Sequence, residues 1–152
     1  MRRLALMLLT AVGFAPAALA SPCPPTYTAY ASAPWVGGNV PPRLDTPGKR
    51  MFRTMIRLGA QSGERFADRY RLAVWGCGTG CQQGALVDTR SGKVIPAPDA
   101  NLGYGVRPGS RLLVVSPLQE GETLADRQGM AISAPITYYL LRGHRLVQVC
   151  AP

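Results

Sequence analysis

The feature that most constrains this chain is the pair Cys77 and Cys81, with glycines at positions 76, 78 and 80. In an extended chain, four residue steps separate Cα atoms by roughly 13 Å, well beyond the roughly 4.4 to 6.8 Å that a disulfide allows. A disulfide here therefore requires the chain to turn back on itself. Glycine adopts the positive φ angles of a tight turn easily and is unfavourable in helices, so the segment predicts the tip of a β-hairpin.

The two other cysteines, Cys23 and Cys150, lie towards the two ends of the chain. Four cysteines permit three pairings. We prefer Cys77 with Cys81 and Cys23 with Cys150, because the second bridge would then join the ends of nearly the whole domain. In the chain-entropy model the short loop contributes about 2 kcal/mol and the long loop about 5 kcal/mol. A bridge from Cys23 to Cys77 would contradict this pairing.

Residues 1–20 have the layout of a cleaved secretory signal, in which Arg2 and Arg3 precede an apolar run that ends at Ala18-Leu19-Ala20. We expect cleavage after Ala20 and a periplasmic or secreted protein, by the general export route or, alternatively, by the twin-arginine route. Disulfides are stable in such oxidising compartments. Neither the apolar run nor any later stretch is long enough to span a bilayer, so no transmembrane segment is expected after cleavage.

The chain carries a net charge of +9, and removal of Arg2 and Arg3 leaves +7. Such a charge attracts anionic partners over a distance. It argues against an inhibitor of a basic lytic enzyme, because the two proteins would repel each other. An arginine-rich base composition explains the charge equally well, so the charge by itself identifies no partner.

Residues 21–46 are rich in proline and glycine and predict an extended arm, followed by a single α+β domain over residues 47–152. The domain opens with a predicted helix over residues 47–61, with Thr46 as its cap. Its apolar stripe is Met51, Phe52, Met55, Ile56 and Leu58, whereas Lys49, Arg50, Arg53 and Arg57 lie largely off that stripe. Two interpretations stay open: an ordinary amphipathic helix that covers a sheet, and a basic helix that meets acidic lipid or phosphate.

The remaining segments predict strands. Alternation of side chains indicates a strand over residues 69–75, and the chain returns over residues 85–88 and 93–95 to form a meander. The apolar run 110–116 indicates a central strand buried on both faces, followed by a helical turn near residues 122–127 and a closing hairpin of 136–141 with 145–149. The predicted fold class is therefore α+β: one N-terminal amphipathic helix packed on a mainly antiparallel sheet of five to six strands, stapled by two disulfides.

The hairpin and its flanks also resemble a known group of proteins. The shared residues are Phe66-Ala67, Tyr70, the run L-A-V-W-G-C-G-T-G-C-Q over 72–82, Val87-Asp88 and Gly92-Lys93-Val94, within residues 52–116. This pattern is similar to small exported bacterial proteins of unknown function with a W-G-C-G-T-G-C-Q core motif. The resemblance implies an exported domain and supplies no catalytic residue. Where that group reads Asn-Phe-Ala-Gly-His-Tyr, Arg69 replaces the histidine, so no role of that histidine transfers to this chain.

We predict that the protein is a small binding protein with an anion-binding surface next to the cysteine turn, made by Arg65, Arg69, Arg71 and Trp75. Guanidinium groups bind phosphate and carboxylate through paired hydrogen bonds, and aromatic rings pack well against guanidinium groups. The expected partner is an anionic envelope polymer, a lipid headgroup or an acidic protein, and nucleic acid is not expected. A solvated strand face is the alternative interpretation of the same residues.

An envelope enzyme and a purely structural envelope protein are the alternative functions. Thiol-disulfide chemistry would use Cys77 and Cys81, but three residues separate them between strands, whereas thioredoxin-like enzymes place two residues between cysteines at a helix start. Hydrolysis would use Asp68 and Asp88, although aspartate is also common in turns. His144 is the only histidine and falls in a predicted turn. We therefore predict no catalytic residue, metal site or cofactor.

Overall fold

The computed structural model describes residues 23–129 and 134–150. The predicted signal sequence, with its cleavage after Ala20, lies outside these residues. Within the two described ranges, no helix is both long and apolar enough to cross a membrane. The described chain has an α+β fold with two disulfides, as predicted.

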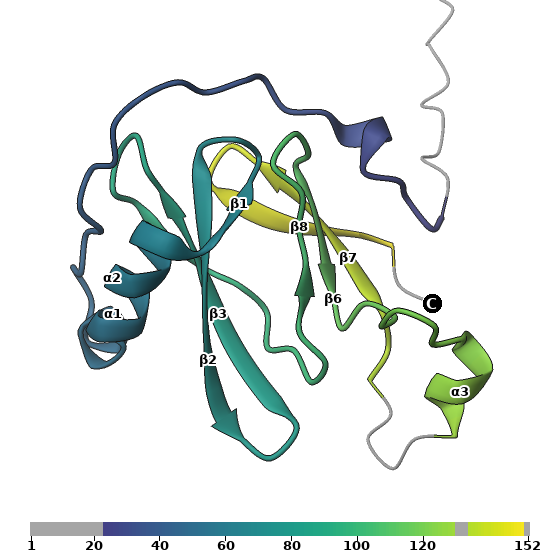
Figure 1. The fold of residues 1–152 in the computed structure, drawn as a ribbon. Helices are drawn as coiled ribbons and strands as arrows, with labels where there is room; N and C mark the ends of the chain where they lie inside the picture. Colours follow the sequence, from purple (N-terminus) through teal and green to yellow (C-terminus); the bar gives the residue numbers. More distant parts are fainter. Residues whose placement is uncertain (1–22, 130–133, 151–152) are drawn as a thin grey trace, which may run out of the picture.

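Two antiparallel sheets of four strands each form the body of the protein, so the prediction of a single sheet of five to six strands was wrong (Figure 1). The first sheet contains, in spatial order, β1 (Glu64–Phe66), β2 (Tyr70–Gly78), β3 (Cys81–Asp88) and β4 (Val94–Pro96). The second contains β5 (Tyr104–Gly105), β6 (Leu112–Val115), β7 (Thr137–Arg142) and β8 (Arg145–Cys150). The meander of β2, β3 and β4 and the closing hairpin of β7 and β8 are confirmed.

The main hydrophobic core lies between the two sheets. Phe66, Tyr70, Leu72, Leu86 and Ile95 contribute from the first sheet, and Leu113, Val115 and Leu141 from the second. All four residues of β6 are buried, and β6 lies between β5 and β7, which confirms the predicted central strand. Alternation along a strand shows which side chains are buried but not which sheet the strand joins, because an apolar face packs equally well on a second sheet.

Helices cover the outer face of the first sheet (Figure 1). The single predicted helix is divided into α1 (Pro47–Met51) and α2 (Arg53–Ser62), because Phe52 between them has φ −97° and ψ 21°. Thr46 caps α1, since its Oγ1 accepts a hydrogen bond from the Lys49 N–H at 3.3 Å. The predicted helical turn near residues 122–127 is α3 (Leu124–Gln128).

The inner side of α2 packs on β2 and β3. Gly59 permits the close approach, because a Cβ at this position would stand 2.2 Å from the Cβ of Ala73. A second, smaller core fills the space between helices and sheet: Ile56, Ala60, Ala85, Val87 and Val94, with Phe52 and Trp75 packed against it. The first sheet is therefore covered on both faces, by the second sheet and by the helices.

The cysteine pair closes the hairpin of β2 and β3, with Cα atoms of Cys77 and Cys81 5.2 Å apart. Gly78 and Gly80 have φ angles of 135° and 65°, as the predicted tight turn requires. The second disulfide joins Cys23 to Cys150, whose Cα atoms are 6.0 Å apart. Both disulfides of the preferred pairing are thus present.

Residues 23–46 run along the surface as an arm whose helical structure is limited to a 3₁₀ turn, Thr28–Tyr30. In Figure 1 the arm passes over one end of the two sheets before it reaches α1. The Val40 N–H donates to the Thr89 carbonyl at 2.8 Å, and the Arg43 N–H donates to the Gly92 carbonyl at 2.7 Å. These bonds hold the arm beside the turn between β3 and β4.

Candidate functional site

Two of the four residues predicted to bind anions, Arg65 and Arg71, lie directly opposite each other on β1 and β2. Arg71 Nη1 donates to the carbonyl of Gly63 at 3.0 Å, and Arg65 Nη2 donates to the carbonyl of Asp68 at 3.3 Å. Neither guanidinium forms an ion pair with a carboxylate of the described residues. Like charges that face each other across a β-ladder repel. This end of the sheet therefore carries uncompensated positive charge.

The two arginines line a cavity of about 470 Å³ between the arm and the first sheet, which we call the arginine pocket. The other lining residues come from the arm and from the ends of the strands: Trp35, Val36, Gly37, Gly38, Asn39, Asp68 and Thr89. Asp68 supplies the one carboxylate of this lining, and it already accepts a hydrogen bond from Ser32 Oγ at 2.7 Å. The pocket thus contains two guanidinium groups and a single, already bonded carboxylate.

Trp35 is the aromatic residue of this pocket. Its indole N–H is buried and has no hydrogen-bond partner among the described residues. The guanidinium carbon of Arg90 lies 5.5 Å from the ring centroid, a cation–π contact. The arm folds tightly against the ring, because a Cβ at Gly37 would stand 2.3 Å from Cζ2 of Trp35. The arm therefore contributes a tightly packed aromatic residue to the wall of the arginine pocket.

Arg69 does not reach the arginine pocket and instead joins a polar cluster at the end of the first sheet. Its Nη2 donates to Oη of Tyr70 at 3.1 Å and lies 3.5 Å from Oδ2 of Asp88. His144, in the turn between β7 and β8, places Nδ1 3.3 Å from the same Tyr70 oxygen. Burial raises the pKa of Tyr70, and the hydrogen bond from Arg69 partly opposes that rise. The Tyr70 hydroxyl thus connects the two sheets, and Arg69 donates a hydrogen bond to it.

Alternation of side chains predicted that Arg69 lies on the same face of the sheet as Arg71. Its side chain does not lie there, because Arg69 precedes the strand. β2 begins at Tyr70, and Ala67 and Asp68 in the turn before it have φ angles of 46° and 59°. Side chains alternate strictly only within extended backbone. A long arginine side chain next to a turn can reach around the end of the sheet to a nearby carboxylate. Here it reaches the carboxylate of Asp88.

The two aspartates considered for hydrolysis are acceptors within the fold. Asp88 is 1% exposed, and its carboxylate accepts hydrogen bonds from the Arg90 N–H and from Ser91 Oγ, both at 3.0 Å. Asp68 accepts the hydrogen bond from Ser32 described above. These bonds fix the turns that flank the hairpin. Among residues 23–129 and 134–150, no group of three or more His, Cys, Asp or Glu side chains could hold a metal ion.

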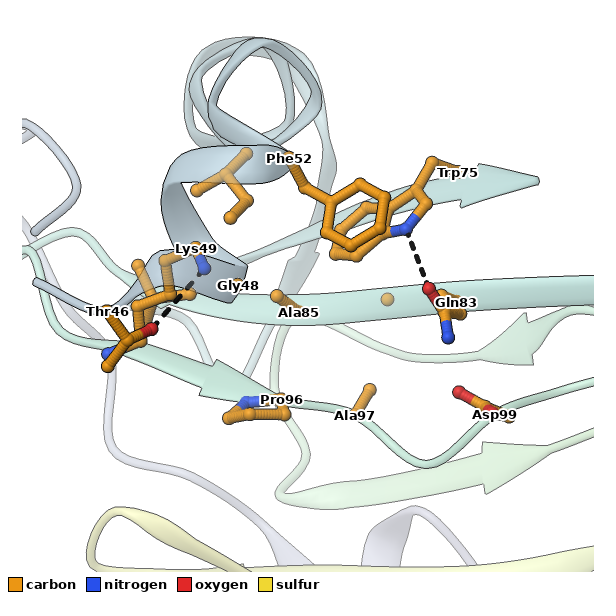
Figure 2. Close-up of a pocket in the computed structure, with 13 residues that line it drawn as sticks. Thr46, Gly48, Lys49, Phe52, Trp75, Gln83, Ala85, Pro96, Ala97 and Asp99 are labelled. Atoms are coloured by element: carbon orange, nitrogen blue, oxygen red, sulfur yellow. Dashed lines mark hydrogen bonds between the residues drawn. The ribbon is translucent and has the colours of Figure 1, made fainter. Parts of the chain in front are cut away.

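Trp75 lines a different cavity, of about 480 Å³, which we call the aromatic cavity (Figure 2). Its ring stacks on that of Phe52, with centroids 4.7 Å apart and 22° between the planes. Its Nε1 donates to Oε1 of Gln83 at 3.1 Å. Trp75 is therefore held in place on the helix-covered face of the sheet, apart from the arginine pocket.

Apolar side chains form most of the wall of the aromatic cavity: Phe52, Ile56, Trp75, Ala85, Val94, Pro96 and Ala97. Figure 2 shows Lys49 and Thr46 at one end and Asp99 at the other. Lys49 Nζ lies 2.6 Å from Oδ1 of Asp45, an ion pair that lowers the pKa of Asp45. This cavity could not be predicted from the sequence, because a helix pair, two strands and a loop become neighbours only in the folded chain. Trp75, which was predicted to be part of the anion-binding surface, was the one residue of this cavity that the sequence had indicated as functional.

No family of known proteins, no curated protein and no solved structure matches this chain. The resemblance to exported proteins with the W-G-C-G-T-G-C-Q core motif therefore stays a prediction from sequence.

Proposed function

We propose that the protein is an exported binding protein that holds a phosphate or carboxylate group of an anionic envelope component in the arginine pocket. The observation that carries this proposal is that Arg65 and Arg71, which lie opposite each other on β1 and β2, both line the arginine pocket, and that neither forms an ion pair with a carboxylate of the described residues. Two like charges opposite each other lower the stability of the fold unless an anion lies between them.

The donors of the pocket suit an oxyanion. A guanidinium group has five N–H donors, and one donor each of Arg65 and Arg71 is bonded to a backbone carbonyl. The remaining donors are available for paired, charge-assisted hydrogen bonds to phosphate or carboxylate oxygens. Because the backbone contacts already restrain both side chains, little further ordering accompanies binding.

The size of the pocket and the charge of the chain favour an anionic polymer as the partner. A cavity of about 470 Å³ lies within the range of small-ligand sites and exceeds the needs of a single phosphate ion. The net charge of +7 that remains without Arg2 and Arg3 attracts a polyanion to the protein over a longer distance than the pocket itself reaches. A lipid headgroup and an acidic protein present the same oxyanion chemistry and are alternatives that experiment can separate.

Isothermal titration calorimetry with inorganic pyrophosphate and with a galacturonic acid trimer tests the proposal. We expect binding that weakens with added salt and that falls at least tenfold in the variant Arg65→Gln plus Arg71→Gln. The matched control is Arg142→Gln plus Arg145→Gln, which removes the same charge from a second pair of arginines that lie opposite each other on β7 and β8, are exposed, and do not line the arginine pocket. Equal loss in both variants would mean that net charge alone attracts the ligand, and would contradict a pocket.

The aromatic cavity supports a second candidate function, the binding of a flat apolar ligand. The stacked rings of Phe52 and Trp75 provide a preformed apolar wall, and mostly apolar clefts of this size are typical of small-molecule sites. We expect 1-anilinonaphthalene-8-sulfonate to change the emission of Trp75 in a Trp35→Phe background. Additional substitution of Ala97 by Phe, which fills the cavity, should abolish the change, and a change that persists would exclude this site.

A further inference from the structure

Helices α1 and α2 present an apolar ridge to solvent. Met51, Met55 and Leu58 are four and three residues apart and so line up along one side of the helix pair. Their side chains are 73%, 36% and 52% exposed. Phe52 and Ile56, which pack on the first sheet, lie on a different side. The three exposed residues, which we call the apolar ridge, therefore lie outside the buried core between helix and sheet.

A stripe of arginines lies on the other flank of the solvent-facing side from the apolar ridge. Arg50, Arg53 and Arg57 are three and four residues apart, and all three are exposed. None of them forms an ion pair with a carboxylate of the described residues. The sequence from 46 to 63 contains no Asp or Glu, and Asp45 before it pairs with Lys49. The solvent-facing side of the helix pair is thus apolar and positively charged.

We propose that the solvent-facing side of α1 and α2 docks on the surface of an anionic phospholipid bilayer. The apolar ridge would enter the boundary between headgroups and acyl chains, and the three arginines would contact lipid phosphates. A helix whose free side carries both arginines and exposed apolar residues has the chemistry of an interfacial helix. Long arginine side chains keep their charge at the headgroup level while their stems cover apolar surface.

The positive charge on the solvent-facing side of α1 and α2 favours a bilayer, and not a second copy of the chain, as the partner. In a symmetric dimer the same arginines would face each other and repel. Three apolar side chains also provide far less than the roughly 800 Å² that each partner buries in a stable protein interface. A bilayer needs only shallow insertion, and each basic side chain near an anionic surface strengthens binding roughly fivefold.

The helix pair is already held in the geometry that docking requires. Gly59 packs against Ala73, and Phe52 stacks on Trp75, so the inner side fixes the helices on the sheet. The outer side therefore does not have to fold when it meets the bilayer, and the entropic cost of ordering a free amphipathic peptide does not arise.

Vesicle co-sedimentation of the processed chain recovered from expressing cells tests the proposal. We expect binding to vesicles of phosphatidylglycerol and phosphatidylcholine in equal parts, and none to pure phosphatidylcholine. The variant Arg53→Gln plus Arg57→Gln should bind at least tenfold more weakly. The variant Met51→Ser plus Leu58→Ser should also lose at least tenfold. Circular dichroism should show that both variants are folded.

Matched controls locate the contact. Arg142→Gln plus Arg145→Gln removes equal charge elsewhere, and Leu118→Ser plus Leu124→Ser removes leucines exposed elsewhere; both should bind vesicles as the unsubstituted protein does. The proposal would be overturned if the protein did not bind anionic vesicles, or if the controls lost as much vesicle binding as the test variants. It would also be overturned if Arg65→Gln plus Arg71→Gln alone abolished vesicle binding, because the lipid headgroup would then bind in the arginine pocket. Binding that free glycerol phosphate abolishes would also overturn it, because a soluble phosphate lacks the acyl boundary.

Discussion

Arg69 and Arg71 are two residues apart in the sequence, yet the fold gives them opposite environments. Arg69 lies against the buried carboxylate of Asp88 and the hydroxyl of Tyr70. Arg71 faces Arg65, and its described bond is to the carbonyl of Gly63. The difference teaches that the number of arginines in a segment does not identify a binding site. What distinguishes Arg71 is a positive charge that no neighbouring carboxylate neutralises.

Arg127 belongs with Arg69 in this comparison. It is 4% exposed, its Nη2 donates to Oε2 of Glu122 at 2.6 Å, and its Nη1 donates to the carbonyl of Ser116 at 2.9 Å. The bond to Glu122 raises the pKa of Arg127 above its already high value. Arg69 and Arg127 are therefore structural cations, and Arg65 and Arg71 are the candidates for a ligand.

The largest effect is expected where a structural cation loses its buried carboxylate. Asp88→Asn should lower the free energy of unfolding by about 3 kcal/mol. The amide keeps one oxygen for the Arg90 N–H, but it removes the negative charge beside Arg69 and places an NH2 group where Oδ2 accepts from Ser91 Oγ, at a buried site. Urea unfolding followed by circular dichroism measures the change. Asp99→Asn, at an exposed position, is the control, and it should change stability by less than about 0.5 kcal/mol.

A somewhat smaller effect is expected at the other structural cation. Arg127→Ala should lower the free energy of unfolding by about 2 kcal/mol, because the carbonyls of Ser116 and Pro117 lose their donor. The same urea titration measures it. Arg142→Ala, at an exposed turn, should have little effect on stability. If both substitutions lowered the free energy of unfolding equally, the distinction between structural and uncompensated arginines would be wrong.

The pair of Glu122 and Arg127 also predicts a dependence of stability on pH. Hydrogen bonds from Arg127 and the Gln119 N–H hold the pKa of Glu122 at about 2, below its ordinary value of 4.5. The carboxylate is therefore favoured in the folded state, so its stabilising contribution is complete above pH 4.5 and is lost as the pH falls towards 2. We expect Glu122→Gln to flatten the fall in Tm over this range, and an unchanged pH profile would contradict the ion pair.

The smallest effect on stability is expected at the uncompensated arginines. Arg71→Gln should change the free energy of unfolding by no more than about 0.5 kcal/mol, or increase it slightly, because it relieves the repulsion across the ladder. Urea unfolding in the absence of phosphate is the measurement. A loss comparable with that of Asp88→Asn would show that Arg71 is structural and would remove the reason to expect a ligand beside it.

Local sequence signals predicted the helix region and most strands. The glycines around Cys77 and Cys81 indicated the hairpin, and Thr46 with Pro47 indicated the helix start. The break at Phe52 and the short strands β1 and β5 were missed, because three or two residues are too few to show a period. β4 is equally short, but the turn at Gly92 before it indicated a returning strand. Within the predicted site, alternation placed Arg71 correctly on the sheet but could not place Arg69, which lies in a turn.

The sequence by itself determined which segments would be extended or helical and where the chain would reverse, because backbone preference and the spacing of apolar residues act over a few neighbours. Only the tertiary structure decided that the strands divide into two sheets, that Arg65 and Arg71 meet under the arm, and that Phe52 stacks on Trp75. These contacts join residues far apart in the chain. Their energies depend on packing and on nearby charge, which no local pattern records.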